Sequence, residues 1–300
     1  MPPDIDPALS ADRYGLANEW SSADTPDTQV LGHPRFDEAM VVAARSFVGF
    51  YRGNWVLNRI ANDRGRVITS FIMLDLHFSN GMTGFTVAQL REEARHRNIC
   101  SPNRMTALAA LLQVGGFLKA VPSKDSRMRR LAPTEAMLTL HRERLAGAIA
   151  ANVLINPDLA AVLPLLGQNQ ILGDIARSYL SYWRSGQRAT GNDPALEAFI
   201  ERDAAFTILF LLLTGLAEGR AYRISDFARH FAISRAHALS IMRAGMDFGL
   251  IAQNGPNGPY LGQPKLLETM RPFFLALFQI QADAVRHALR QHALRRVIAP

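Results

Sequence analysis

The chain has 300 residues, of which 48% are hydrophobic and 20% are charged, and it contains a single cysteine. This composition is typical of a folded globular protein, and it excludes both extensive disorder and an internal disulfide framework. The most apolar stretch, residues 204–213, is about half as long as the roughly 20 residues that cross a bilayer. We therefore predict a buried core helix there, no membrane partner and a cytoplasmic location.

The formal net charge of +7 is unevenly distributed along the chain. Residues 1–38 carry eight acidic and two basic side chains, a net charge of −6, so the remaining residues carry +13. A basic body behind an acidic leader indicates a polyanionic partner. Basic side chains scattered over a solvated surface are the alternative, and the position of these residues in the fold decides between the two.

The spacing of apolar residues predicts a mainly α-helical fold. Helices are expected over 36–60, 67–78, 133–154, 168–183, 194–216 and 264–296, with Pro133 in the first turn of its helix. Residues 1–35, rich in Pro, Asp and Ser, are expected to form a flexible leader.

Short helices, glycines and hairpins follow one another in a pattern typical of a winged helix-turn-helix domain. Thr86 and Gln89 have the spacing of a capping box at the start of a short helix. Ser101 and Pro102 are expected to be the N-cap and first residue of the next helix, which ends at Gly115-Gly116. Strands over 117–121 and 127–131 then form a hairpin.

The same pattern occurs a second time. Ser225 and Ser234 are expected to cap two successive helices, Gly249 ends the second of them, and strands follow over 250–253 and 260–261. An internal repeat of this length predicts two domains of one kind. We place the flexible acidic leader at 1–35, the first winged helix domain with its flanking helices at 36–160, and the second, with a long C-terminal helix, at 161–300.

Residues 124–135, KDSRMRRLAPTE, resemble the wing of the MarR family of bacterial regulators, and the resemblance extends over residues 66–155. Residues 233–251 resemble winged helices in general, although the following hairpin lacks basic residues. MarR proteins are dimers, so the resemblance implies a fused pseudo-dimer whose two halves are tied by long helices. The family often holds small aromatic ligands, which implies a pocket near Trp55, Tyr179 and Trp183; a role in the core is the alternative for these residues.

The expected DNA contacts lie at the cap and first turns of each second helix and on the basic hairpin. They are Ser101, Asn103, Arg104, Thr106, Lys124, Arg127, Arg129 and Arg130 in the first copy, and Ser234, Arg235, His237, Ser240 and Arg243 in the second. Arginine pairs with guanine and asparagine with adenine in the major groove. Because the two sets differ and only the first hairpin is basic, we expect transcriptional regulation through an asymmetric operator, with the first half dominating affinity.

A degenerate winged-helix protein that binds a protein partner or a small ligand is the alternative function. The neutral second hairpin favours it, and the basic first hairpin opposes it. His96 and Cys100 could supply at most two metal ligands, and no catalytic or phosphate-binding signature occurs. We therefore expect no enzyme activity, cofactor or metal, and either a monomeric pseudo-dimer or a homodimer.

Overall fold

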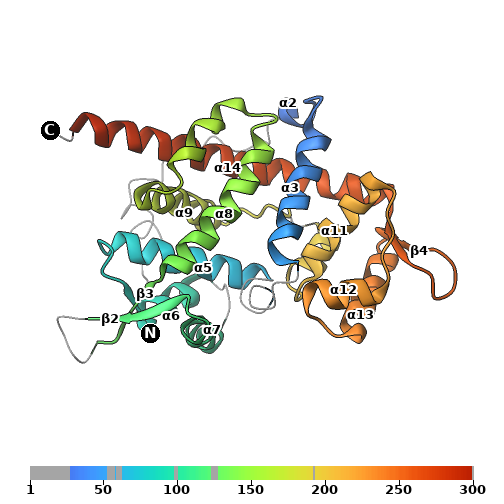
Figure 1. Ribbon diagram of the computed structural model, residues 1–300, viewed down its shortest axis with the longest axis horizontal. Helices are drawn as coiled ribbons and strands as arrows, with labels where there is room; N and C mark the ends of the chain where they lie inside the picture. The colour runs from blue at the N-terminus through green and yellow to red at the C-terminus, as the bar shows by residue number, and fades with distance from the viewer. Residues whose placement is uncertain are drawn as a thin grey trace, which may run out of the picture.

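The computed structural model describes residues 28–52, 58, 63–97, 101–122, 128–191 and 193–298. This part of the chain is mainly helical with small antiparallel sheets, as predicted (Figure 1). The helices are α2 (Thr28–Leu31), α3 (Phe36–Tyr51), α5 (Arg64–Ser79), α6 (Val87–Arg97), α7 (Pro102–Val114), α8 (Glu135–Asn152), the 3₁₀ helix η2 (Pro157–Leu165), α9 (Asn169–Arg184), α10 (Pro194–Ile200), α11 (Ala205–Glu218), α12 (Ile224–Phe231), α13 (Arg235–Asp247) and α14 (Pro264–Ile298). The strands are β1 (Phe85–Thr86), β2 (Leu118–Val121), β3 (Arg130–Pro133), β4 (Ile251–Gln253) and β5 (Tyr260–Gly262).

Two helices differ from the prediction because of their backbone. Pro133 is the last residue of β3, opposite Leu118, and not part of a helix. A proline is tolerated at the end of an edge pairing, where its missing N–H costs little. The helix predicted over 194–216 is divided into α10 and α11 because Ala204 has a left-handed backbone (φ 60°).

The cap of α12 and the end of the leader also differ from the prediction. Ser225 lies inside α12, because Asp226 accepts the hydrogen bond from the Arg223 N–H and moves the start of the helix forward. The predicted flexible leader ends in α2, and the Leu31 carbonyl accepts a hydrogen bond from Arg271 of α14. Residues 28–35 are therefore part of the folded structure.

We call β1, α6, α7, β2 and β3 the first unit. Its strands form one antiparallel sheet in the order β1-β3-β2. The predicted capping box is confirmed: the Thr86 N–H donates to Gln89 Oε1 (2.9 Å), and the Gln89 N–H donates to Thr86 Oγ1 (3.1 Å). The Ser101 hydroxyl oxygen accepts from the Arg104 N–H (3.2 Å) and begins α7, which ends before Gly116 in the left-handed conformation.

We call α12, α13, β4 and β5 the second unit. Tyr222 pairs with Tyr260 in an isolated antiparallel bridge, which corresponds to the pairing of Phe85 with Leu131 in the first unit. The Ser234 hydroxyl oxygen accepts from the His237 N–H (3.1 Å), so α13 begins as α7 does. The element order of the two units is therefore the same.

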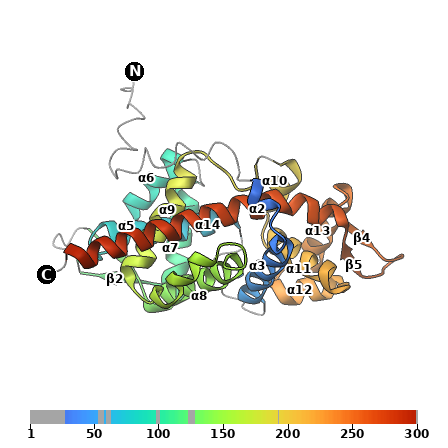
Figure 2. The same ribbon diagram turned by 90° about the horizontal axis from the view of Figure 1, so that it is seen from above.

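The two units are interlocked by an exchange of helices. Helix α3, which precedes the first unit, packs against α8 and against α11; helix α9, which precedes the second unit, packs against α14 and against α5. The two exchanged helices carry a short repeat, Ala44-Arg45-Ser46-Phe47 and Ala176-Arg177-Ser178-Tyr179, 132 residues apart. Figure 2 shows α14 running along most of the molecule, so the units share one continuous core.

His141 of α8 is a buried member of this core. Its ring meets that of Phe71 edge-on (centroids 5.0 Å apart), and its Nδ1 has no hydrogen-bond partner among the described residues. Burial, together with the charge of Arg144, lowers the pKa of His141 to about 3. An offset of 133 residues aligns it with Phe274 of α14, which packs against Phe210 in the same way.

The buried His141 predicts a specific acid sensitivity. Because its pKa is lower in the folded than in the unfolded protein, the unfolded state binds more protons below about pH 6.5, and stability falls as the pH is lowered. The contribution of one such group is about 1.4 kcal/mol per pH unit between pH 6.5 and its folded pKa. His141→Phe should therefore flatten the dependence of unfolding free energy on pH, as measured by urea denaturation from pH 7 to 4. An unchanged slope would contradict the assignment.

Candidate nucleic-acid interface and central cavity

Helices α7 and α13 lie along the same lower edge of the molecule in Figure 1, and the two hairpins extend at opposite ends. On α7, Asn103, Arg104 and Thr106 are exposed, as expected for a binding surface. The Thr106 hydroxyl donates to the Pro102 carbonyl of its own helix (3.0 Å). The rest of the exposed face is apolar, with Ala107, Ala110, Leu111 and Val114, the last 89% exposed.

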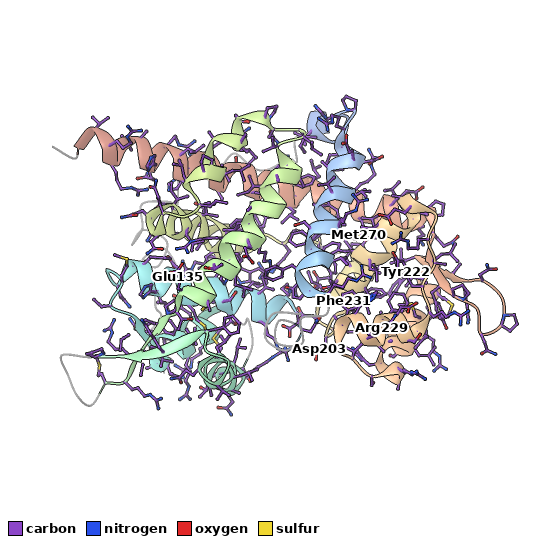
Figure 3. The ribbon with its side chains drawn as sticks, in the orientation of Figure 1. Glu135, Asp203, Tyr222, Arg229, Phe231 and Met270 are labelled. Carbon is purple, nitrogen blue, oxygen red and sulfur yellow. The ribbon has the colours of Figure 1, made fainter. Side chains whose placement is uncertain are left out.

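A chain of polar contacts joins α7 to α13. Arg104 Nη2 lies 2.8 Å from Asp63 Oδ2, and Arg66 Nε lies 3.1 Å from the same oxygen. Arg66 Nη1 contacts Asp203 Oδ1 (3.2 Å), and His237 Nε2 lies 3.0 Å from the Asp203 carbonyl oxygen. Figure 3 places Asp203 at the lower side of the molecule, between the two units.

This chain of contacts changes the expected roles of two predicted base contacts. Arg104 and His237 occupy corresponding positions, 133 residues apart, and both point toward the junction. The Asp63 carboxylate is only 1% exposed, and it also caps α5 by accepting from the Arg66 N–H (2.9 Å). Since a buried carboxylate needs such partners, these contacts set the position of α7 relative to α13.

The second unit presents free cations on α13. Arg235, Ser240 and Arg243 are exposed, and neither arginine has an acidic partner among the described residues. The hydroxyl of Ser234 is engaged as the N-cap. The charge of this helix is therefore available to a polyanion, whereas the arginine of α7 is paired.

The basic hairpin of the first unit is described only in part. Lys124 and Arg127 lie outside the described residues, and Arg129 is exposed. Arg130 donates to the carbonyl oxygens of Thr83 (3.1 Å) and Gly84 (2.6 Å). Its guanidinium therefore fastens the base of the hairpin to the turn before β1, a structural role that its charge alone did not indicate.

A cavity of about 200 Å³ lies between α3, α5, α8, α9 and α14. Its walls are apolar and largely aromatic, with Phe47, Phe71, Tyr179, Tyr182 and Trp183. Burial raises the pKa of Tyr179 to about 12, so its hydroxyl stays protonated. Tyr179 and Trp183, which the family resemblance places near a pocket, both line this cavity, whereas Trp55 lies outside the described residues.

Three arginines line the cavity and differ in their partners. Arg64 is paired with Glu197 (3.0 Å) and Glu201 of the α10 region. Arg188 lies over the Trp183 ring (3.5 Å to its centroid) and donates to the Trp183 carbonyl. Arg144 is half-buried and has no acidic partner among the described residues.

Unsatisfied oxygens lie beside this free cation. Gln281, only 1% exposed, has an Oε1 without a hydrogen-bond partner in the described structure, as does Gln187. Buried acceptors of this kind are rarely left unpaired in a native protein. The cavity therefore offers an apolar body, a positive charge and acceptors for a donor group, a combination suited to a small aromatic acid.

Comparisons with protein-family models, with curated proteins and with solved structures found no match for this chain. In the described part of the chain, no helix is both long and apolar enough to cross a membrane. The same residues contain no group of three or more His, Cys, Asp or Glu side chains that could hold a metal ion. The side chain of His96 and the whole of Cys100 lie outside this part.

Proposed function

We propose that this protein is a DNA-binding transcriptional regulator that contacts an asymmetric operator through two unlike winged helix-turn-helix units. The observation that carries the proposal is the repeated order of two helices and a hairpin, with α7 and α13 held on one edge. In such folds the second helix enters the major groove and the hairpin contacts the backbone. The resemblance of the first hairpin to the MarR wing agrees with this assignment.

The surface charges support a polyanionic partner with an altered division of work between the units. Arg235 and Arg243 on α13 are free to contact bases or phosphates, whereas Arg104 on α7 is held by Asp63. Lys119 and Arg129 of the first hairpin are exposed. We therefore propose that the first unit contributes mainly backbone contacts from its hairpin, and that the second contributes base contacts from its helix.

Selection from a random duplex library with the full chain tests this function. We expect one enriched sequence with two unlike half-sites, bound by one chain. A perfect palindrome bound by two chains would show that pairing is intermolecular and would contradict the fused pseudo-dimer. The absence of any bound duplex would favour the protein-binding alternative, which the apolar exposed face of α7 supports.

Arg235→Ala is expected to relax base preference at a single operator position. The loss of one bidentate base contact should cost about 1–3 kcal/mol of discrimination at that position and little elsewhere. Arg290→Ala, an exposed arginine on α14, is the matched control and should leave the preference unchanged. Competition binding with single-base operator variants measures both. An identical preference in the Arg235→Ala protein would place α13 away from the bases.

We further propose that the central cavity binds a small aromatic effector that carries a carboxylate. Its volume exceeds the about 150 Å³ of a cavity known to hold benzene. The carboxylate would pair with Arg144, whose charge lacks a partner, and a hydroxyl on the ring would donate to Gln281 Oε1. Aromatic side chains on the walls then stack against the ligand ring.

Arg144→Leu is expected to weaken the binding of 4-hydroxybenzoate by about 10–100-fold, because a charge-assisted hydrogen bond contributes about 1.5–3 kcal/mol. The substitution introduces the residue that the repeat places in α14, Leu277. Isothermal titration calorimetry measures the affinity. Arg142→Leu, a neighbouring arginine that does not line the cavity, is the control. Equal affinity for 4-hydroxybenzoate and 4-hydroxybenzamide would contradict the assigned charge pairing.

A further inference from the structure

The core has two corresponding aromatic stacks. Phe71 of α5 stacks on Tyr179 of α9 (centroids 5.4 Å apart, planes at 15°), and Phe210 of α11 stacks on Phe47 of α3 (5.3 Å, 20°). The residues correspond through the repeat, Phe71 to Phe210 at an offset of 139 and Phe47 to Tyr179 at 132. The molecule therefore has an approximate two-fold relation between its halves, and the stacks mark two corresponding places.

Only one of these places is hollow. The cavity lies beside the first stack, where Val67 and Ala148 form part of its wall. Beside the second stack, Phe206 replaces Val67, and its ring packs against those of Phe210 (5.1 Å) and Phe273 (4.8 Å). Phe274, in the place of His141, fills the space on the other side of Phe210 (5.6 Å). These rings leave no corresponding cavity among the described residues.

The hollow side is also joined to the first unit by buried charges. Arg184 follows the cavity residue Trp183 on α9, and its side chain is 13% exposed. Its Nη1 lies 3.0 Å from Asp75 Oδ2 on α5, and its Nη2 lies 3.1 Å from Glu93 Oε2 on α6. Arg177 reaches the other Asp75 oxygen (3.3 Å). One side chain thus spans from the cavity wall to the first helix of the first unit.

The corresponding connection is missing on the filled side. Arg52 takes the place of Arg184, but Thr214 stands where Asp75 would be, and His230 stands where Glu93 would be. The Thr214 hydroxyl donates to the Leu211 carbonyl of its own helix (2.8 Å). Arg52 and Arg229 lie close enough to His230 to contribute to the lowering of its pKa, behind the larger effect of burial, so cations face this histidine where the first unit has an ion pair.

We propose that the chain binds one effector, on the side of the first stack, and that its occupancy acts on the first unit alone through the Arg184 bridge to Glu93. The inference rests on the proposed effector function. A ligand against Tyr182 and Trp183 contacts the last turns of α9, the same turns that carry Arg184. Since α6 is attached to this turn and α12 is not, a shift of α9 changes the position of α6 only.

Calorimetry and amide hydrogen exchange on the full, DNA-free chain test the proposal, with 4-hydroxybenzoate as the probe. We expect one ligand per chain and slower exchange in residues 87–97, with no change in residues 224–231. Val67→Phe, which copies the filled side, should abolish binding. Glu93→Gln should keep the affinity but lose the response of 87–97.

Glu92→Gln is the matched control, because Glu92 is exposed and bonds Arg95 of its own helix. It should keep both the affinity and the response. Two ligands per chain, equal responses of the two segments, or a full response in Glu93→Gln would overturn the proposal. If neither 4-hydroxybenzoate nor 4-hydroxybenzamide binds, the effector function itself fails and this inference fails with it. Binding without a response in 87–97 overturns the one-sided coupling alone.

Discussion

The affinity of the full chain for its selected duplex is expected to fall by about 10³–10⁵-fold between 50 and 200 mM salt. The physical reason is counterion release: neutralising about 6–10 phosphates frees the same number of condensed cations. Exposed basic side chains on both units supply these contacts, namely Lys119, Arg129, Arg235 and Arg243 among the described residues. Fluorescence anisotropy with a labelled duplex at several salt concentrations measures the slope.

Paired substitutions connect the slope to particular side chains. Arg127→Ala with Arg129→Ala should reduce the slope by about two, since each lost phosphate contact removes about one. Asn254→Ala, in the neutral hairpin of the second unit, is the control and should leave it unchanged. A binding constant that does not vary with salt would exclude a phosphate-dominated interface and promote the protein-binding alternative.

Phe210→Ala is expected to lower the free energy of unfolding by about 3–5 kcal/mol. Phe210 is 7% exposed, and its ring meets those of Phe47, Phe206, Phe273 and Phe274, so its removal leaves a cavity at the centre of the core. Because the exchanged helices α3 and α9 tie both units to this core, unfolding should remain a single transition. Urea denaturation followed by tryptophan fluorescence and by circular dichroism measures both quantities.

Val114→Ala serves as the comparison for this substitution. Val114 is also hydrophobic but is 89% exposed, so its truncation should change stability by no more than about 0.5 kcal/mol. Two separated transitions in the Phe210→Ala protein would show that the units fold independently, and that the shared core contributes less than the packing indicates.

Local signals in the sequence were sufficient for most of the secondary structure. The caps at Thr86, Ser101 and Ser234 depend on residues within three positions, and the structure confirms all three. The ends of α3 and α8 and the break at Ala204 were predicted wrongly, since a strand pairing or a left-handed residue outweighed helical spacing there. The repeat shared by α3 and α9 was present in the sequence and would have indicated the exchange of helices.

The sequence by itself determined the helical class, the repeated order of elements and the residues that could face DNA, because capping and periodicity act over a few residues. Only the tertiary structure decided which cations are free. Arg104 meets Asp63, 41 positions away, and Arg130 meets carbonyls 46 and 47 positions away. The cavity likewise depends on distant parts of the chain, since Val67 and Phe206 differ in effect only through what packs beside them. Pairing and packing between distant residues leave no local pattern in a single sequence, whereas caps and turns do.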